Sequence, residues 1–249
     1  MSNITKKENN ELAVAAESME SWGQSNMSSK DLVLSMILPI QMMSKKSVDG
    51  KAFFGELRDT VNNEKFGDLS TPLQFIPFHM EKVFIESEKD GNKNKFLRSL
   101  PITPANENLP YQEGNLSRDY TINFYCILPS QVNAESAAQG GGCLPYVLSF
   151  RRTSLKAGKK VATQAYAANA AAGKPPAATV MELSVVKTSN DKGTYAVLDT
   201  KMSRLSTKEE LATAYFWFKA MKSMKVKVDE SHLTEENTNT TGMSEPSEF

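Results

Sequence analysis

The densest group of chemically active side chains in this 249-residue chain is a basic cluster between residues 151 and 160. Guanidinium and ammonium groups suit phosphate oxygens, and aromatic rings suit base faces, so the two together meet the needs of a single-strand groove. The aromatic segment YVLSF comes directly before the cluster. We therefore predict that a nucleic acid lies along five residues of the cluster: Arg151, Arg152, Lys156, Lys159 and Lys160.

The cluster has few acidic neighbours in the sequence. Only Asp119 and Glu135 lie in the 32 residues before Arg151, and no acid follows until Glu182. For any single lysine, a solvated helix face is the better interpretation. For the cluster as a whole, the shortage of acidic neighbours favours a polyanionic ligand.

Four residues outside the cluster extend the predicted DNA-binding surface. Tyr125 alternates with polar residues on its strand, so we predict that its ring is available for stacking on a base. Tyr195, early in a later hairpin, is the second stacking candidate. Lys187 and Lys201 flank it on the same hairpin and add positive charge.

Charge is distributed unevenly along the chain. The 29 Lys and Arg balance the 29 Asp and Glu, yet residues 150–227 hold 15 basic and 5 acidic residues, a net of +10. Residues 228–249 hold 6 acidic and no basic residues. A terminal aromatic ring beside carboxylates is typical of a short peptide ligand. We predict that this acidic tail recruits a protein partner through the following residues: Glu235, Glu236, Glu245, Glu248 and Phe249.

Several classes of protein are disfavoured. No apolar run approaches the length of a membrane span, and the N-terminus lacks the pattern of a secretory signal, so we expect a cytoplasmic protein. Two cysteines without a CxxC motif predict free thiols, and the absence of a Cys/His cluster disfavours zinc. No nucleotide-binding or hydrolase motif is present, so we predict no enzyme activity and no cofactor. A nuclease that binds metal through Glu182 and Asp199 stays open as an alternative.

The periodicity predicts three regions along the chain. Residues 1–30 form a flexible N-terminal segment, residues 31–228 a folded domain, and residues 229–249 a disordered tail. Within the domain, strands are expected at 73–87, 120–128 and 144–153, a helix at 154–172, and a hairpin at 178–187 and 193–202. Long loops are expected at 100–119 and 129–143. A last helix, capped by Ser206 and Glu209, has the apolar stripe Leu211, Ala214, Tyr215, Phe218 and Met221.

This order of elements predicts the fold class. A helix between the third and fourth of five strands is the order of an OB-fold, a small Greek-key β-barrel that binds oligonucleotides. We therefore predict a mostly β, OB-fold-like barrel with further helices at its flanks.

The same segments resemble the single-stranded-DNA-binding proteins of tailed bacteriophages. The resemblance covers roughly residues 30–205 plus the tail, and rests on LPYVLSFRRTSLKAGKK, on MELSVVKTSNDKGTYAVLD, on the upstream ILPIQMMSKKSVDGKAFFGEL and LQFIPFHMEK, and on the ending Glu245 to Phe249. It implies a non-catalytic OB-fold protein that coats single strands in replication, recombination or repair. It also implies that the tail recruits a polymerase, helicase or recombination protein.

A second class of function accounts for the same tail. A phage protein-interaction module, such as an inhibitor or adaptor of a host enzyme, would use the tail and the amphipathic N-terminal stretch equally well. It predicts no affinity for nucleic acid. The sequence leaves open whether the chain forms a homo-oligomer, and whether Phe216 and Trp217 of the last helix face the barrel or a second subunit.

Overall fold

The computed structural model describes residues 33–42, 44–90, 93–133, 143–191, 193–223 and 227–228. The predicted N-terminal segment and acidic tail therefore lie outside the described residues. The strands are β1 (Val33–Leu34), β2 (Met36–Pro39), β3 (Leu57–Asp59), β4 (Lys65–Gly67), β5 (Leu73–Asp90), β6 (Lys93–Pro101), β7 (Gln112–Glu113), β8 (Leu116–Ile127), β9 (Tyr146–Arg151), β10 (Thr179–Asn190), β11 (Gly193–Leu205) and β12 (Lys227–Val228). The helices are α2 (Lys45–Val48), α4 (Leu155–Val161), which continues through a π-helical turn (Ala162–Ala167) into α5 (Ala168–Ala171), and α6 (Lys208–Ser223).

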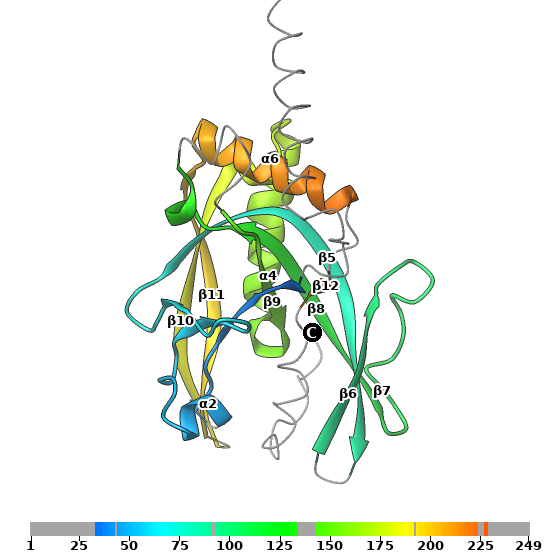
Figure 1. Ribbon diagram of the computed structural model, residues 1–249. Coiled ribbons are helices and arrows are strands. Elements are labelled where there is room, and N and C mark those ends of the chain that lie inside the picture. The colour runs from blue at the N-terminus through cyan, green and yellow to red at the C-terminus, as the bar shows by residue number, and fades with distance from the viewer. Residues whose placement is uncertain are drawn as a thin grey trace, which may run out of the picture.

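Five strands form the barrel part of the curled sheet at the centre of the molecule (Figure 1). Their spatial order is β11-β10-β5-β8-β9, and every neighbouring pair is antiparallel. Numbered along the chain, these strands lie in the order 5-4-1-2-3, and α4 follows the third. The predicted OB-fold-like architecture is confirmed, because the strands and the helix occur in the expected sequence.

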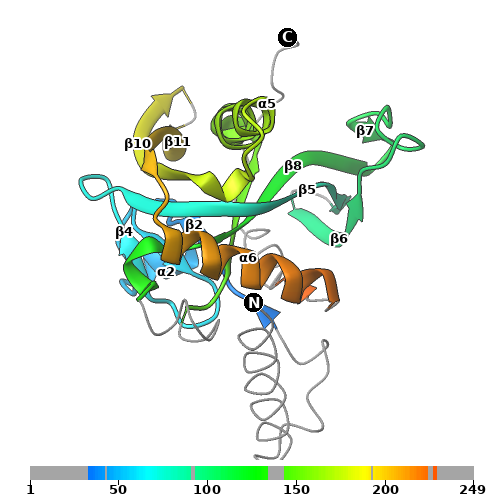
Figure 2. The ribbon, with the colours of Figure 1, turned by 90° about the horizontal axis from the view of Figure 1, so that it is seen from above.

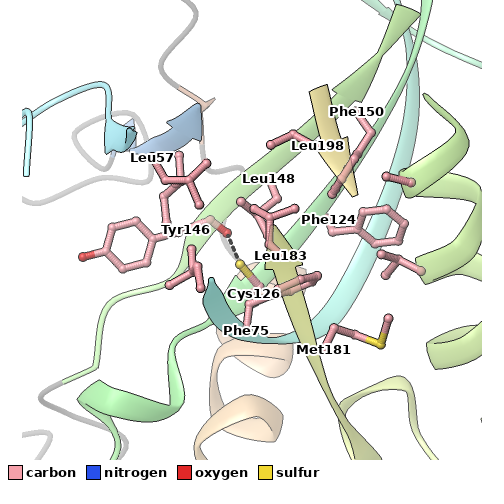
Figure 3. Close-up of a cluster of buried hydrophobic side chains, with 14 of the residues drawn as sticks. Leu57, Phe75, Phe124, Cys126, Tyr146, Leu148, Phe150, Met181, Leu183 and Leu198 are labelled. Carbon is pink, nitrogen blue, oxygen red and sulfur yellow. Dashed lines mark hydrogen bonds between the residues drawn. The ribbon is translucent and has the colours of Figure 1, made fainter. Parts of the chain in front are cut away.

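The interior of the barrel is packed by one face of each strand. On β8 the alternation predicted from the sequence is confirmed, because Ile122, Phe124, Cys126 and Leu128 are all buried in one apolar cluster. Phe150 meets Phe124 edge to face, with ring centroids 5.6 Å apart. The Cys126 thiol donates a hydrogen bond to the Tyr146 carbonyl oxygen within this cluster (Figure 3). Cys126 and Cys143 are both free thiols, as predicted.

Strand β5 pairs with different strands along its length. Its first residues pair with β10, and its second half, from Val83 onward, pairs with β6. Strand β6 was missed by the sequence analysis, and β8 begins four residues before the predicted strand, because charged residues interrupt the apolar pattern in both places. The second half of β5, with β6, β7 and the start of β8, forms an arm that extends from the barrel (Figure 1).

A buried carboxylate fixes the base of this arm. Glu86 accepts a hydrogen bond from Arg118 Nε at 2.8 Å and another from Arg98 Nε at 2.7 Å. Burial alone would raise the pKa of Glu86, but the hydrogen bonds from the two guanidinium groups outweigh it and lower the pKa. Arg118 also binds Glu113 at 2.9 Å, so one network joins β5, β6, β7 and β8.

Helices cover the two sides of the sheet. The helix α4–α5 lies on one side of β5 and β8, and α6 lies on the other (Figure 2).

The predicted cap of α6 is wrong by one residue: Thr207 Oγ1 accepts the Glu210 N–H, while Ser206 Oγ donates to the Ala177 carbonyl oxygen. The predicted stripe is also wrong at Tyr215, which is exposed, whereas Trp217 packs inward.

The last closure of the barrel is made by a side chain. Strand β9 continues the sheet through the parallel strand β2, whereas β11 pairs with β10 alone among the described strands. Gln41, just after β2, bridges to β11: its Nε2 donates to the Ala196 carbonyl oxygen at 3.0 Å, and its Oε1 accepts the Ala196 N–H at 2.9 Å. One glutamine amide thus stands in for a residue of a neighbouring strand.

We expect Gln41→Ala to lower the free energy of unfolding by about 1–3 kcal/mol, because both backbone groups of Ala196 lose their partner. Urea unfolding followed by circular dichroism measures the change. Gln74→Ala is the matched control, since Gln74 is exposed and its amide reaches only the Ser203 hydroxyl, at 3.2 Å. Equal losses in the two variants would show that the Gln41 bridge does not stabilise the barrel.

Candidate nucleic-acid interface

The helix α4 lies over the seam between β9 and β11. Ser154, just before the helix, accepts the Leu198 N–H through its Oγ at 3.1 Å. The hydroxyl of Thr200 donates to the Ala157 carbonyl oxygen at 2.9 Å. These two bonds tie the start of α4 to β11.

A glycine allows the helix to approach β9 closely. A Cβ atom on Gly158 would lie 2.7 Å from the Phe150 Cβ and 3.0 Å from its Cγ. Ala157, Gly158 and Val161 form the buried face of the helix. The opposite face therefore carries Lys156, Lys159 and Lys160 into solvent, as the helical spacing requires.

Arg152 is held by a buried acid. Its Nε donates to Asp119 Oδ2 at 2.8 Å, and its Nη2 lies 2.7 Å from the same oxygen. Asp119 is buried on β8, and the backbone of Arg152 has a φ of 49°, in the left-handed region that non-glycine residues rarely adopt. The ion pair stabilises the sharp turn between β9 and α4. The charge of Arg152 is thereby matched within the protein.

Two more of the predicted cations have acidic partners from distant strands. Lys160 binds Asp199, and Lys201 lies 2.8 Å from Glu182 across the β10–β11 hairpin. The hydrogen bond from Lys160, and the charge of Lys156 with it, lower the pKa of Asp199. The shortage of acids near the cluster in the sequence therefore does not leave Lys160 unpaired, because the fold brings Asp199 to it from β11.

We define the basic belt as the six cations that run from the end of β9 along α4 to β11: Arg151, Arg152, Lys156, Lys159, Lys160 and Lys201. Three acids pair with members of the belt, namely Asp119, Glu182 and Asp199. Six positive and three negative charges leave a net of +3. Lys156 and Lys159 are both exposed on the solvent face of α4. The belt is thus a locally positive surface rather than a uniform row of unmatched cations.

The two stacking candidates lie in different environments. Tyr195 is half-buried on β11 and shares a face with Asp199 and Lys201, because all three have odd positions in a regular stretch of the strand. It thus continues the surface of the belt toward the hairpin turn. Lys187 is exposed near the same turn, opposite Ala196 in the ladder.

Tyr125 is buried, and this corrects the prediction of an available ring. Its hydroxyl donates to Glu81 Oε2 at 2.8 Å, and its ring lies 5.3 Å from that of His79. The ring belongs to a second apolar cluster that packs against α6. The polar residues that alternate along β8 predicted an exposed face, but α6 covers that face at Tyr125.

The outer face of β8 and β9, which binds oligonucleotides in OB-folds, is partly covered in this protein. Val147 and Ile127 lie in the second apolar cluster with Tyr125. The arm also carries exposed cations that were not predicted as site residues, such as Lys95 and Arg98. The alternating KNKFLRSLP pattern was the signal that could have revealed this strand and its basic side chains.

The alternative carboxylate site can be assessed where the structure describes it. Glu182 and Asp199 are engaged by Lys201 and Lys160, so each is paired with a lysine. Across the described ranges, no group of three or more His, Cys, Asp or Glu side chains is placed to hold a metal ion. In the same residues, no helix is both long enough and apolar enough to cross a bilayer. The tail residues Glu235, Glu236, Glu245, Glu248 and Phe249 lie outside the described part of the chain.

The comparison with known proteins identifies a phage family. The model of a family described as Pam3 phage gp34-like protein matches residues 6–232, which is most of the chain. No curated protein and no solved structure matches the chain.

We expect Gly158→Ala to lower the free energy of unfolding by about 1–3 kcal/mol, because the added methyl group must displace the base of the Phe150 side chain. Helix propensity alone predicts the opposite sign, a gain of roughly 0.5–1 kcal/mol. Chemical denaturation of the variant therefore separates the two effects, with Lys159→Ala on the exposed face as control. A gain in stability for Gly158→Ala would contradict the close seating of α4 on β9.

Proposed function

The chain belongs to the Pam3 phage gp34-like protein family, and from this premise we propose that it binds single-stranded DNA without sequence preference. The binding serves phage DNA replication, recombination or repair and involves no catalysis. The observation that carries the proposal is the position of the basic belt on an OB-fold-like barrel, beside the third strand and across to the β10–β11 hairpin.

The arrangement suits a flexible anionic strand. Lys156 and Lys159 present two ammonium groups on one exposed helix face, and Tyr195 adds a ring farther along the same side of β11. Phosphate contacts supply affinity for any sequence, and stacking adds roughly 1–3 kcal/mol per base. The hairpin between the fourth and fifth strands is one of the two connections that OB-folds use for oligonucleotides.

Because the outer face of β8 and β9 is partly covered, we place the DNA on a different path. In this protein the DNA runs along α4 and the hairpin rather than over Tyr125, whose surroundings are filled by α6. The exposed cations of the arm, Lys95 and Arg98, lie on the connection between the first and second strands, which is the other usual contact region. The paired belt residues Arg152 and Lys160 mainly hold the belt in place.

The acidic tail supplies the second part of the proposed function. Its carboxylates and the terminal Phe249 form a peptide ligand for replication or recombination proteins of the host or phage. Removal of residues 229–249 should leave DNA affinity unchanged or higher, since it removes only negative charge from the chain. The same deletion should abolish partner recruitment.

We expect a labelled single strand to bind tightly and a matched duplex weakly in a fluorescence-anisotropy titration. The logarithm of the affinity should fall against the logarithm of salt concentration by about 0.7 per phosphate neutralised. Lys156→Glu and Lys159→Glu should each weaken binding to all sequences alike and make this slope shallower. These residues are better probes than Arg152, because replacement of Arg152 would remove the partner of the buried Asp119 carboxylate and disturb folding.

Lys208→Glu is the matched control, because Lys208 is exposed on α6, on the other side of the sheet from α4 (Figure 2). It should change affinity far less than the two belt variants. Equal effects of all three reversals would move the DNA path away from the belt. Absence of binding by the unmodified chain at low salt would overturn the proposal and favour the protein-interaction module.

A further inference from the structure

The outward face of α6 carries two large exposed rings. Tyr215 has 57% of its surface exposed and Phe216 has 43%, although the helix is otherwise well seated. The Phe216 ring also meets Trp217 edge to face, at 5.5 Å between centroids. Adjacent exposed aromatic side chains mark an interaction surface more often than isolated ones do.

The inward face of α6 fixes which residues point outward. Leu211, Ala214, Phe218 and Met221 pack into the second apolar cluster against the sheet. The indole of Trp217 donates a hydrogen bond to the Cys143 carbonyl oxygen at 2.7 Å. The helix therefore cannot rotate to bury Tyr215 and Phe216 without losing these contacts.

The exposed residues of α6 are arranged symmetrically about the point between the two rings. Ala212 and Glu209 precede Tyr215 by three and six residues. Lys219 and Lys222 follow Phe216 by three and six residues. All six side chains are exposed, so they form one stripe with an acid at one end and a base at the other.

We propose that this stripe is a homodimer interface, in which α6 packs antiparallel to α6 of a second copy across a twofold axis between Tyr215 and Phe216. An isologous contact sets each residue against its symmetric position on the other copy. Tyr215 then packs on the Phe216 of the second copy, and Glu209 faces its Lys222. The small Ala212 makes room for the stem of Lys219.

Charge complementarity selects a second copy over other occupants. The antiparallel pairing gives two Glu209–Lys222 pairs, one on each side of the axis, whereas a parallel pairing would set each lysine against its own copy. A nucleic acid on the same stripe would place phosphates beside the exposed Glu209 carboxylate. The helices α6 and α4 lie on opposite sides of β5 and β8, so packing of α6 on a second copy leaves the exposed lysines of α4 accessible (Figure 2).

The first test is the mass of the full chain in solution, measured by light scattering and sedimentation over a range of concentrations. A dimer has a mass of 2 × 27.5 kDa, or 55 kDa. Tyr215→Ser combined with Phe216→Ser should give a folded monomer of half that mass. Phe53→Ser is the matched control, because Phe53 is 77% exposed and lies outside the stripe, so it should leave the dimer intact.

A charge swap provides the sharper test. Glu209→Lys alone and Lys222→Glu alone each create two like-charge contacts, so each should weaken dimerisation at least about tenfold. The double variant restores opposite charges and should recover most of the dimer. This recovery is not expected if the single changes act only by destabilising α6, and a double variant as weak as the singles would overturn the antiparallel arrangement.

A monomeric mass for the unmodified chain up to about 0.1 mM would overturn the proposal outright. A Trp22→Phe chain, which keeps Trp217 as its one indole, then identifies the alternative occupant. Quenching of Trp217 by a single-stranded oligonucleotide in a monomer would assign the stripe to nucleic acid. The dimer does not depend on the proposed DNA binding, so either can fail while the other stands.

Discussion

The structure depends on how the seam between β9 and β11 is closed. A five-stranded barrel needs contact between its third and fifth strands, which are β9 and β11 here. Among the described strands, however, β11 forms backbone hydrogen bonds with β10 alone. Side chains close the seam instead: Gln41 binds both backbone groups of Ala196, Ser154 accepts the Leu198 N–H, and the Thr200 hydroxyl reaches the Ala157 carbonyl oxygen. Unpaired backbone groups at such an edge would be costly if buried. The segment after β2 and the start of α4 are therefore parts of the barrel rather than additions to it.

The closure of the seam also determines where the protein carries positive charge. Because α4 must lie across the seam with Gly158 against Phe150, its opposite face is turned to solvent. The lysines on that face are brought next to the outer face of β11, where Asp199 meets Lys160. On the other side of the sheet, α6 fills the surface that a barrel of this type would otherwise leave open, and it carries its own exposed stripe. Thus each helix that completes the apolar packing also carries a distinct set of exposed side chains, lysines on α4 and two aromatic rings on α6.

The sequence was a good guide to whatever depends on local periodicity. It predicted the five strands of the barrel, their order around the helix, and the buried face from Ile122 to Leu128, because a period of two residues follows from strand geometry. It was a poor guide wherever a distant segment decides the outcome. Tyr125 looked exposed because nothing in its strand indicates that α6 covers it. Lys160 has few acidic neighbours in the sequence, yet Asp199 reaches it through the fold. The shift of the α6 cap from Ser206 to Thr207 has a similar cause, since Ser206 is engaged by Ala177 on a preceding segment.

Strand β8 connects the arm to the basic belt through two consecutive residues. Arg118 points to one face of the strand and binds the buried Glu86, which holds the arm. Asp119 points to the other face and binds Arg152, which holds the turn into α4. Both pairs involve buried carboxylates, and removal of one partner from such a pair typically costs about 3–5 kcal/mol. A shift of β8 by one residue would exchange the two faces and break both pairs at once. The register of this strand therefore fixes the arm and the belt together, and a ligand that contacts both meets two surfaces held by a common support.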